Sequence, residues 1–103
     1  MSITAVHVGD IGTVFELTIY DGSSVVDISS ATTKQITLQT PTGTSTTYTA
    51  VFSGTGTDGK IKYTTTTALI LSVAGMWKIQ GVVVMPAGTW HTSVETFQVH
   101  PNL

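Results

Sequence analysis

Hydrophobic and polar residues alternate along most of this chain with a period of two. The clearest example is residues 13–20, where Phe15, Leu17 and Ile19 fall on one face and Val14 and polar residues fall on the other. A period of two places successive side chains on opposite faces of a β-strand, whereas a helix repeats every 3.6 residues. We therefore predict a strand over residues 13–20 that turns these three side chains toward a core.

The same alternation predicts about seven strands in total. They cover residues 2–8, 13–20, 33–40, 45–53, 60–65, 76–85 and 89–99. Gly, Pro, Asp and Asn separate them at intervals of roughly ten residues, which is typical of a β-sandwich or barrel. We predict one all-β domain over residues 1–103, with all strands paired antiparallel. An immunoglobulin-like sandwich is the leading architecture.

Each predicted strand has an expected inward face, and Trp77 is the expected buried anchor of the core. The chain has no cysteine, so this indole has no disulfide to pack against. The other residues expected to point inward are Ile3, Ala5, His7, Ile36, Leu38, Tyr48, Ala50, Phe52, Ile61, Tyr63, Ile79, Gly81 and Val83.

Three segments break the simple pattern. Residues 25–31 resemble a crossing loop with an apolar plug, and residues 66–74 fit either one helical turn or a buried loop. In residues 89–99, the early apolar positions are out of phase with Phe97 and Val99. Because one inserted residue reverses the faces of a strand, we predict a one-residue β-bulge near Glu95.

Composition supports the all-β prediction and adds a hint of assembly. Thr, Val and Ile supply 21, 12 and 8 of the 103 residues, and β-branched side chains suit a pleated, half-buried surface. Charged residues make up only 10%, and the formal net charge is -2. Such a neutral surface offers little repulsion against self-association.

The composition also argues against several classes of function. The chain has no Arg, and its four lysines (Lys34, Lys60, Lys62 and Lys78) are dispersed, which argues against nucleic-acid binding. The absence of Cys excludes thiolate chemistry and Cys-based zinc sites. The N-terminal residues do not resemble a signal peptide, and no stretch approaches the ~20 apolar residues of a membrane span. We expect synthesis in a cytoplasm.

The histidines are the first candidates for chemistry. His91 is the natural base for a hydrolytic triad, but no nucleophile motif accompanies it, so we expect no enzyme and no catalytic residue. His7, His91 and His100 meet only if the first and last strands lie side by side. Their spacing resembles no zinc motif, and we predict no metal site and no cofactor.

Loop carboxylates and one tryptophan remain as candidates for binding. Asp21, Asp27 and Asp58 suit calcium or simple turn formation, and turn formation is favoured because no EF-hand pattern is present. Trp90 and His91 follow a turn and suit either an exposed platform for a sugar ring or a cover for one end of the core. A carbohydrate-binding module that contacts host-surface glycans is therefore an alternative function.

Strand edges are the structural feature most relevant to assembly. Unpaired N–H and C=O groups at an edge invite another chain, and monomers usually guard such edges with Lys or Pro, which are few here. Residues 2–8 and 97–103 therefore suit intersubunit contact, and the alternative is that they are ordinary termini on the surface of a monomer.

The order of turns and core anchors resembles a known family. The segments that carry the resemblance are Val8-Gly9-Asp10-Ile11-Gly12-Thr13, Asp21-Gly22, Val26-Asp27-Ile28-Ser29, Pro41-Thr42-Gly43, Asp58-Gly59-Lys60-Ile61-Lys62-Tyr63, Gly75-Met76-Trp77-Lys78-Ile79-Gln80 and Phe97-Gln98-Val99. Together they are similar to small Ig-like virion proteins of tailed bacteriophages, especially the N-terminal domain of baseplate upper proteins.

This resemblance implies a structural component of the virion that acts by assembly with other virion proteins and with itself. It implies no catalytic residues and a location in the virion after synthesis in the host bacterial cytoplasm. Baseplate upper proteins continue into a longer segment that carries receptor-binding proteins, and this sequence ends at Leu103. The expected role is therefore a baseplate, neck or tail accessory, a connector, or a capsid decoration protein.

Overall fold

The computed structural model describes residues 6–67 and 70–102, and within them it contains strands and no helix. This confirms the all-β prediction. The strands are β1 (Val6–His7), β2 (Val14–Thr18), β3 (Tyr20–Asp21), β4 (Ser24–Val25), β5 (Thr33–Gln39), β6 (Ser45–Thr49), β7 (Val51–Phe52), β8 (Lys60–Thr64), β9 (Gly75–Met85), β10 (Gly88–His91) and β11 (Glu95–His100).

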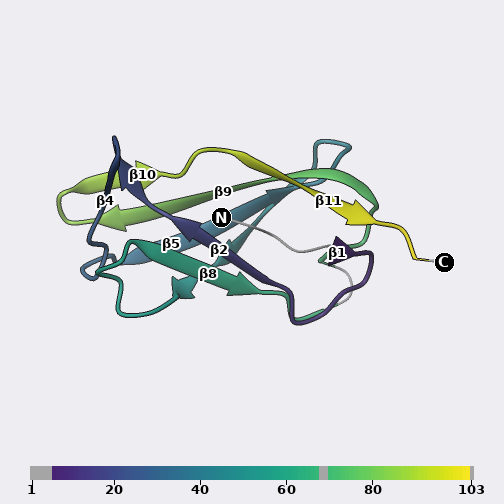
Figure 1. Cartoon of the computed structure of the whole chain (residues 1–103), viewed down its shortest axis with the longest axis horizontal. Helices are drawn as coiled ribbons and strands as arrows, with labels where there is room; N and C mark the ends of the chain where they lie inside the picture. Colours follow the sequence, from purple (N-terminus) through teal and green to yellow (C-terminus); the bar gives the residue numbers. More distant parts are fainter. Residues whose placement is uncertain (1–5, 68–69, 103) are drawn as a thin grey trace.

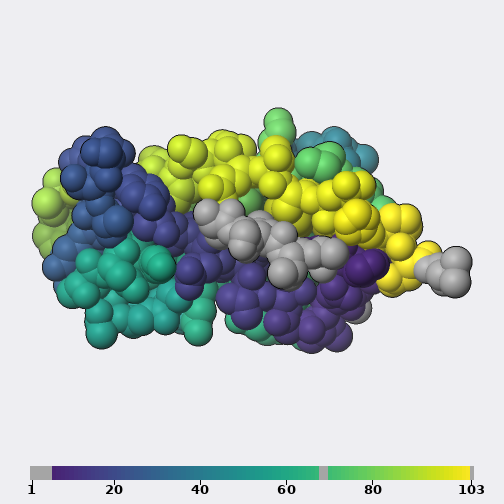
Figure 2. Space-filling model, viewed as in Figure 1, coloured from purple at the N-terminus to yellow at the C-terminus, as the bar shows by residue number. Residues whose placement is uncertain are grey.

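The strands form two layers and one projecting hairpin (Figure 1). The larger sheet has the order β1-β11-β9-β5-β6, and β10 also pairs with β9. The smaller sheet has the order β2-β8-β7, and β3 and β4 pair only with each other. The molecule measures 46 × 21 × 21 Å, and the C-terminal strand runs to one tip (Figure 2).

The core lies between the two sheets, and the predicted alternation gives the buried face of β2 correctly. Phe15, Leu17 and Ile19 are all buried, as the sequence predicts. Trp77 is buried too, and its Nε1 donates a hydrogen bond of 2.8 Å to the carbonyl oxygen of Val73. The ring of Phe97 lies 4.9 Å from that of Phe15 and 6.1 Å from that of Trp77. This aromatic group joins β2 to β9 and β11 across the layers.

Three of the predicted strands are divided in the structure. Residues 13–20 contain β2 and β3, residues 45–53 contain β6 and β7, and residues 89–99 contain β10 and β11. β4 is additional and completes a hairpin whose turn includes Gly22, with a φ of 65°. The described residues therefore contain eleven strands rather than about seven.

The division of residues 45–53 occurs at Ala50, where the chain changes sheets. β6 pairs with β5 of the larger sheet, whereas β7 pairs with β8 of the smaller one. Ala50 lies between them, is buried, and donates its N–H to the carbonyl oxygen of Lys34 at 2.9 Å. A small buried residue suits this corner because both sheets come together there.

The N-terminal strand corrects two predictions. β1 pairs with β11 in parallel, with Val6 opposite Val99, so pairing is not antiparallel throughout. Val6 is buried and His7 is exposed, so His7 does not point inward as predicted. The predicted inward residues Ile3 and Ala5 lie outside the described residues.

Two loops supply further core residues. Ile28 is fully buried in the crossing loop of residues 25–31, which confirms the predicted plug. In residues 66–74, Leu71 is fully buried and the described positions are not helical, which favours the buried loop. Ala68 and Leu69 of that prediction lie outside the described residues.

The shift in phase within residues 89–99 occurs at Thr92. Trp90 lies opposite Val83 and Glu95 opposite Ile79, so five steps on one strand match four on β9. The one-residue insertion is therefore correct, but it opens a gap over residues 92–94 instead of a bulge within one strand. Thr92 fills this gap: its N–H donates to the carbonyl oxygen of Gly81, and its Oγ1 accepts from the N–H of Gly81, both at 2.9 Å.

We predict that Thr92→Val destabilises the fold by about 1–3 kcal/mol, because the buried N–H of Gly81 loses its acceptor. Urea unfolding followed by fluorescence measures the change. Thr92→Ser is the matched control, since it keeps the hydroxyl and removes one methyl group, worth about 1 kcal/mol or less. Equal losses in the two variants would contradict the role given to the hydroxyl.

Candidate functional site

Two of the three histidines lie together, and the third lies apart. His7 and His100 are directly opposite on β1 and β11, with ring centroids 5.6 Å apart. His91 lies opposite Val82 on β9, whereas Val99, beside His100, lies opposite Gly75. Seven residues of strand separate these positions, or about 23 Å. The described residues contain no group of three or more metal-ligating side chains.

The candidate calcium ligands belong to local turns. The carboxylate of Asp27 accepts a hydrogen bond of 3.0 Å from the N–H of Ser29, and this bond holds the pKa of Asp27 below its usual value. Asp58 accepts from the N–H of Lys60 at 3.2 Å, and Asp21 lies in the β3–β4 hairpin. The carboxylates of Asp27 and Asp58 therefore each bond within their own turn, as expected of Asp at these positions.

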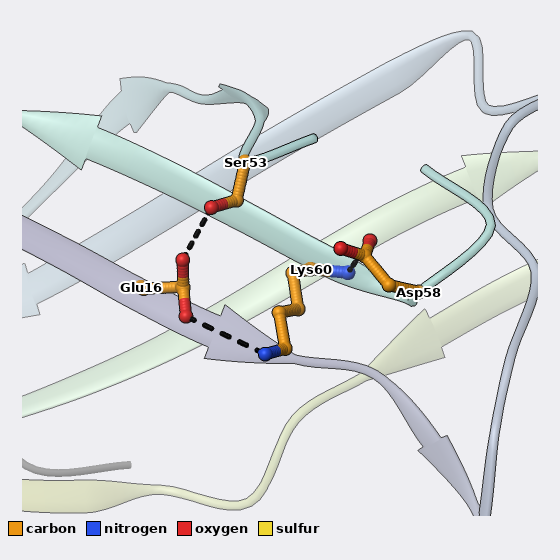
Figure 3. A network of polar contacts seen from close by, with 4 residues as sticks. All are labelled: Glu16, Ser53, Asp58 and Lys60. Atoms are coloured by element: carbon orange, nitrogen blue, oxygen red, sulfur yellow. Dashed lines mark hydrogen bonds and ion pairs between the residues drawn. The ribbon is translucent and has the colours of Figure 1, made fainter. Parts of the chain in front are cut away.

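A small polar network crosses the smaller sheet (Figure 3). Glu16 on β2 accepts a hydrogen bond from the hydroxyl of Ser53, which follows β7, and its other oxygen lies 3.9 Å from Nζ of Lys60 on β8. The ion pair is largely exposed, so it adds little to stability. The network ties three strands together at the surface and leaves no unpaired acid and base side by side.

Trp90 and His91 point to opposite sides of β10. Trp90 is half-buried and packs on the core, whereas His91 is exposed. A sugar platform needs a flat, exposed indole, and Trp90 instead covers one end of the core.

Tyr48 and Tyr63 connect the two sheets beside the β6–β7 corner. Their rings stack at 4.6 Å with an interplanar angle of 18°. Burial, followed by the neighbouring phenol of Tyr63, raises the pKa of Tyr48 above its ordinary value of 10.0, while the side chain of Thr46 opposes the shift.

The outer face of the larger sheet has a shallow groove beside β6. Its lining residues come from β5, β6 and β9, together with one residue of the 92–94 gap: Thr37, Gln39, Ser45, Lys78, Ile79, Gln80 and Val94. The groove combines polar and apolar side chains and carries a single charged one, Lys78, so it offers surface for contact more than a place for catalysis.

The free edge of β6 is the most distinctive exposed feature of the larger sheet. At one end of the β5–β6 ladder, the N–H of Ala50 bonds to the carbonyl oxygen of Lys34. Because bonded pairs alternate in an antiparallel ladder, Tyr48 and Thr46 also direct their N–H and C=O groups toward β5. The remaining residues of β6 direct these groups away from β5.

These outward positions are Ser45, Thr47 and Thr49, and all three residues are exposed. β6 ends the strand order of the larger sheet, so none of the other described strands pairs with this edge. Residues 45–49 contain no Lys, Pro or acidic residue, which are the usual guards of an edge. The structure thus presents an uncharged strand edge to solvent.

The segments predicted to make intersubunit contacts are differently situated. β11 pairs with β9 along one edge, and on its other edge β1 covers only Val99 and His100. Residues 95–98 of that edge pair with none of the described strands. β1 does lie at an edge, but only two residues belong to it. The sequence interpretation missed β6 as the principal edge; the available signal was the run Ser-Thr-Thr-Tyr-Thr, which lacks the strong apolar alternation of an interior strand.

No protein-family model, curated protein or solved structure gives a significant match to this chain. Within the described residues, no helix is long and apolar enough to cross a membrane.

We predict that the wild-type fold loses more stability at alkaline pH than a Tyr48→Phe variant does. The raised pKa favours the neutral phenol of Tyr48 in the folded state. The contribution of Tyr48 to the free energy of unfolding is therefore complete below the unfolded pKa of about 10. It is lost as the pH rises through the higher folded pKa. Urea unfolding at about pH 8 and pH 11 measures the two losses.

The control for this comparison is Tyr20→Phe, which removes a phenol from an exposed position on β3. An equal loss of stability in wild type and Tyr48→Phe between the two pH values would contradict the assignment to Tyr48.

Proposed function

We propose that this protein is a structural component of a tailed-phage virion, built as an Ig-like domain and acting by protein–protein assembly. Its partners are other virion proteins and further copies of itself, and its position is that of a baseplate, neck or tail accessory, or a capsid decoration. In this proposal it is made in the host bacterial cytoplasm and acts without catalysis or a cofactor.

The order of strands supports the Ig-like part of the proposal. Variable-type immunoglobulin domains add a C′ strand to the sheet of strands G, F and C, and strands B, E and D lie in the opposite sheet. The order β11-β9-β5-β6 matches G, F, C and C′, and the order β2-β8-β7 matches B, E and D. Phe15 and Trp77 occupy the core of strands β2 and β9, where antibody domains carry their disulfide.

The observation that carries the assembly role is the exposed, uncharged edge of β6. A strand edge of this kind is a template for another chain. The surrounding surface is equally compatible with contact, because the neighbouring groove has one charged residue and Val51 is 54% exposed just beyond β6. The titratable side chains, by contrast, are engaged in turns or dispersed over the strands.

We predict that the purified chain has a mass above 10.8 kDa at high concentration, measured by size-exclusion chromatography with light scattering over a dilution series. A mass of one chain throughout would contradict self-assembly. Glycan titration followed by Trp fluorescence is the parallel measurement. Quenching that Trp90→Ala abolishes would favour the carbohydrate-binding module over the assembly role.

A second prediction addresses the virion. Mass spectrometry of purified phage particles from cells that express this chain should detect it at a fixed ratio to the major tail or capsid proteins. Its absence from intact particles, with abundant chain left in the cell lysate, would overturn the virion assignment. A washed particle preparation from cells that lack the chain is the control.

A further inference from the structure

We propose that β6 is a self-pairing edge, at which two copies of this chain join antiparallel about a two-fold axis through Thr47. The larger sheets of the two copies then form one continuous sheet. The inference rests on the assembly function proposed above and names the surface and the partner.

The backbone of β6 sets the register of this pair. Ser45, Thr47 and Thr49 direct their N–H and C=O groups outward, and Ser45–Thr49 is the full extent of the strand. With Thr47 on the axis, Ser45 of each copy lies opposite Thr49 of the other. All three pairs are then of the hydrogen-bonded type, which gives roughly six backbone hydrogen bonds. Any other two-fold register leaves at least one outward pair unused.

Side chains at the junction suit identical partners. The two-fold axis places Thr47 opposite its own copy, so a charge at this position would repel its copy. The β6 edge carries only hydroxyl and phenol side chains. Thr47 already shares a hydrogen bond of 2.9 Å with Thr37 on the outer face, and cross-strand Thr–Thr pairs are favourable.

The nearest positive charges on the larger sheet do not oppose the pairing. Lys34 lies on β5 and Lys78 on β9, so their copies are separated by three and five strand spacings. At about 4.8 Å per spacing, the separations are roughly 14 and 24 Å. Both exceed the Debye length of about 8 Å at physiological ionic strength. The repulsion is therefore largely screened.

The other free edges are less suited to a second copy. β1 and β7 have two residues each, β10 has four, and the part of β11 that β1 leaves uncovered, residues 95–98, also has four. On β2, the ladder bonds of Thr13 and Ile19 to the β8 side leave Val14, Glu16 and Thr18 facing outward. A two-fold axis through that edge sets the carboxylate of Glu16 opposite its copy, which is destabilising. Among the described strands, β6 therefore has the free edge best suited to pairing with the same strand of a second copy.

The size of the contact predicts a reversible dimer. Five residues of strand are about 17 Å long, and an edge contact of this length falls at or below the ~1,200 Å² of weak, transient interfaces. The mass should therefore fall from two chains to one on dilution. In a larger assembly, other contacts would keep two β6 edges close together. This raises their effective concentration and strengthens the pairing.

The decisive variant is Thr47→Lys, which places an ammonium group on the axis and leaves every backbone bond between β6 and β5 intact. We expect at least a tenfold rise in the dissociation constant from light scattering or analytical ultracentrifugation. Thr96→Lys is the matched control, because Thr96 is an exposed threonine of the same sheet on β11, and β9 and β5 separate it from β6. It adds the same charge and should dimerise like wild type. Circular dichroism checks that both variants are folded.

Amide hydrogen exchange by NMR tests the register without a substitution. In the single chain, the N–H groups of Thr46 and Tyr48 bond to β5, whereas those of Ser45, Thr47 and Thr49 face solvent. We expect protection of the three outward amides to increase with protein concentration, while the two inward amides stay protected throughout.

The outcomes separate this inference from the proposed function. Association that Thr47→Lys leaves unchanged, or outward amides that exchange rapidly in the associated state, would overturn the β6 pairing and leave assembly through another surface. A monomer at every concentration would overturn the pairing too, and detection of the chain in particles would still support the virion role. Loss of dimer in Thr47→Lys alone, with concentration-dependent protection, supports the inference.

Discussion

The junction between Thr92 and Gly81 is the constraint on which the larger sheet depends. One edge of β9 must pair with β10 and β11, whose residues are out of phase by one position. Thr92 lies where the extra residue is inserted. Its N–H donates to the carbonyl oxygen of Gly81, and its Oγ1 accepts from the N–H of Gly81. Gln80 Nε2 donates to the carbonyl oxygen of Thr92 at 2.9 Å. The backbone N–H and C=O groups of Thr92 and Gly81 thereby have partners, and Phe97 and Val99 face the core beyond the gap.

The same junction controls how closely the two sheets approach. A Cβ atom at Gly81 would lie 3.0 Å from the terminal methyl groups of both Leu17 and Ile61 on the smaller sheet. Glycine therefore lets β2 and β8 pack directly over the middle of β9. The aromatic group of Phe15, Trp77 and Phe97 fills the wider space toward one end. The sheets lie close together at Gly81, and large aromatic rings occupy the core elsewhere. Together they give a close-packed core.

The hydrophobic pattern of the sequence predicted the features that depend on residues close together in the chain. The alternation of Phe15, Leu17 and Ile19 fixes which side is buried, and the phase change before Phe97 predicted an inserted residue, because both depend on neighbours in sequence. Pairing partners depend on the whole chain. Nothing within Val6–His7 specifies parallel pairing with β11, and Ala50 marks a change of sheet only because the strands on either side have different partners.

The candidate surface could not be predicted from the sequence for the same reason. Catalytic and metal sites are sought through residue types, and here Asp27 and Asp58 bond within their own turns, while His91 lies far from His7 and His100. The unused hydrogen-bonding capacity is in the backbone, where every residue looks alike. Ser45, Thr47 and Thr49 become a surface for recognition only because β6 is last in its sheet. In a chain so poor in charge, position within the sheet decides which strand can meet a partner, and the uncharged side chains of β6 leave that edge open.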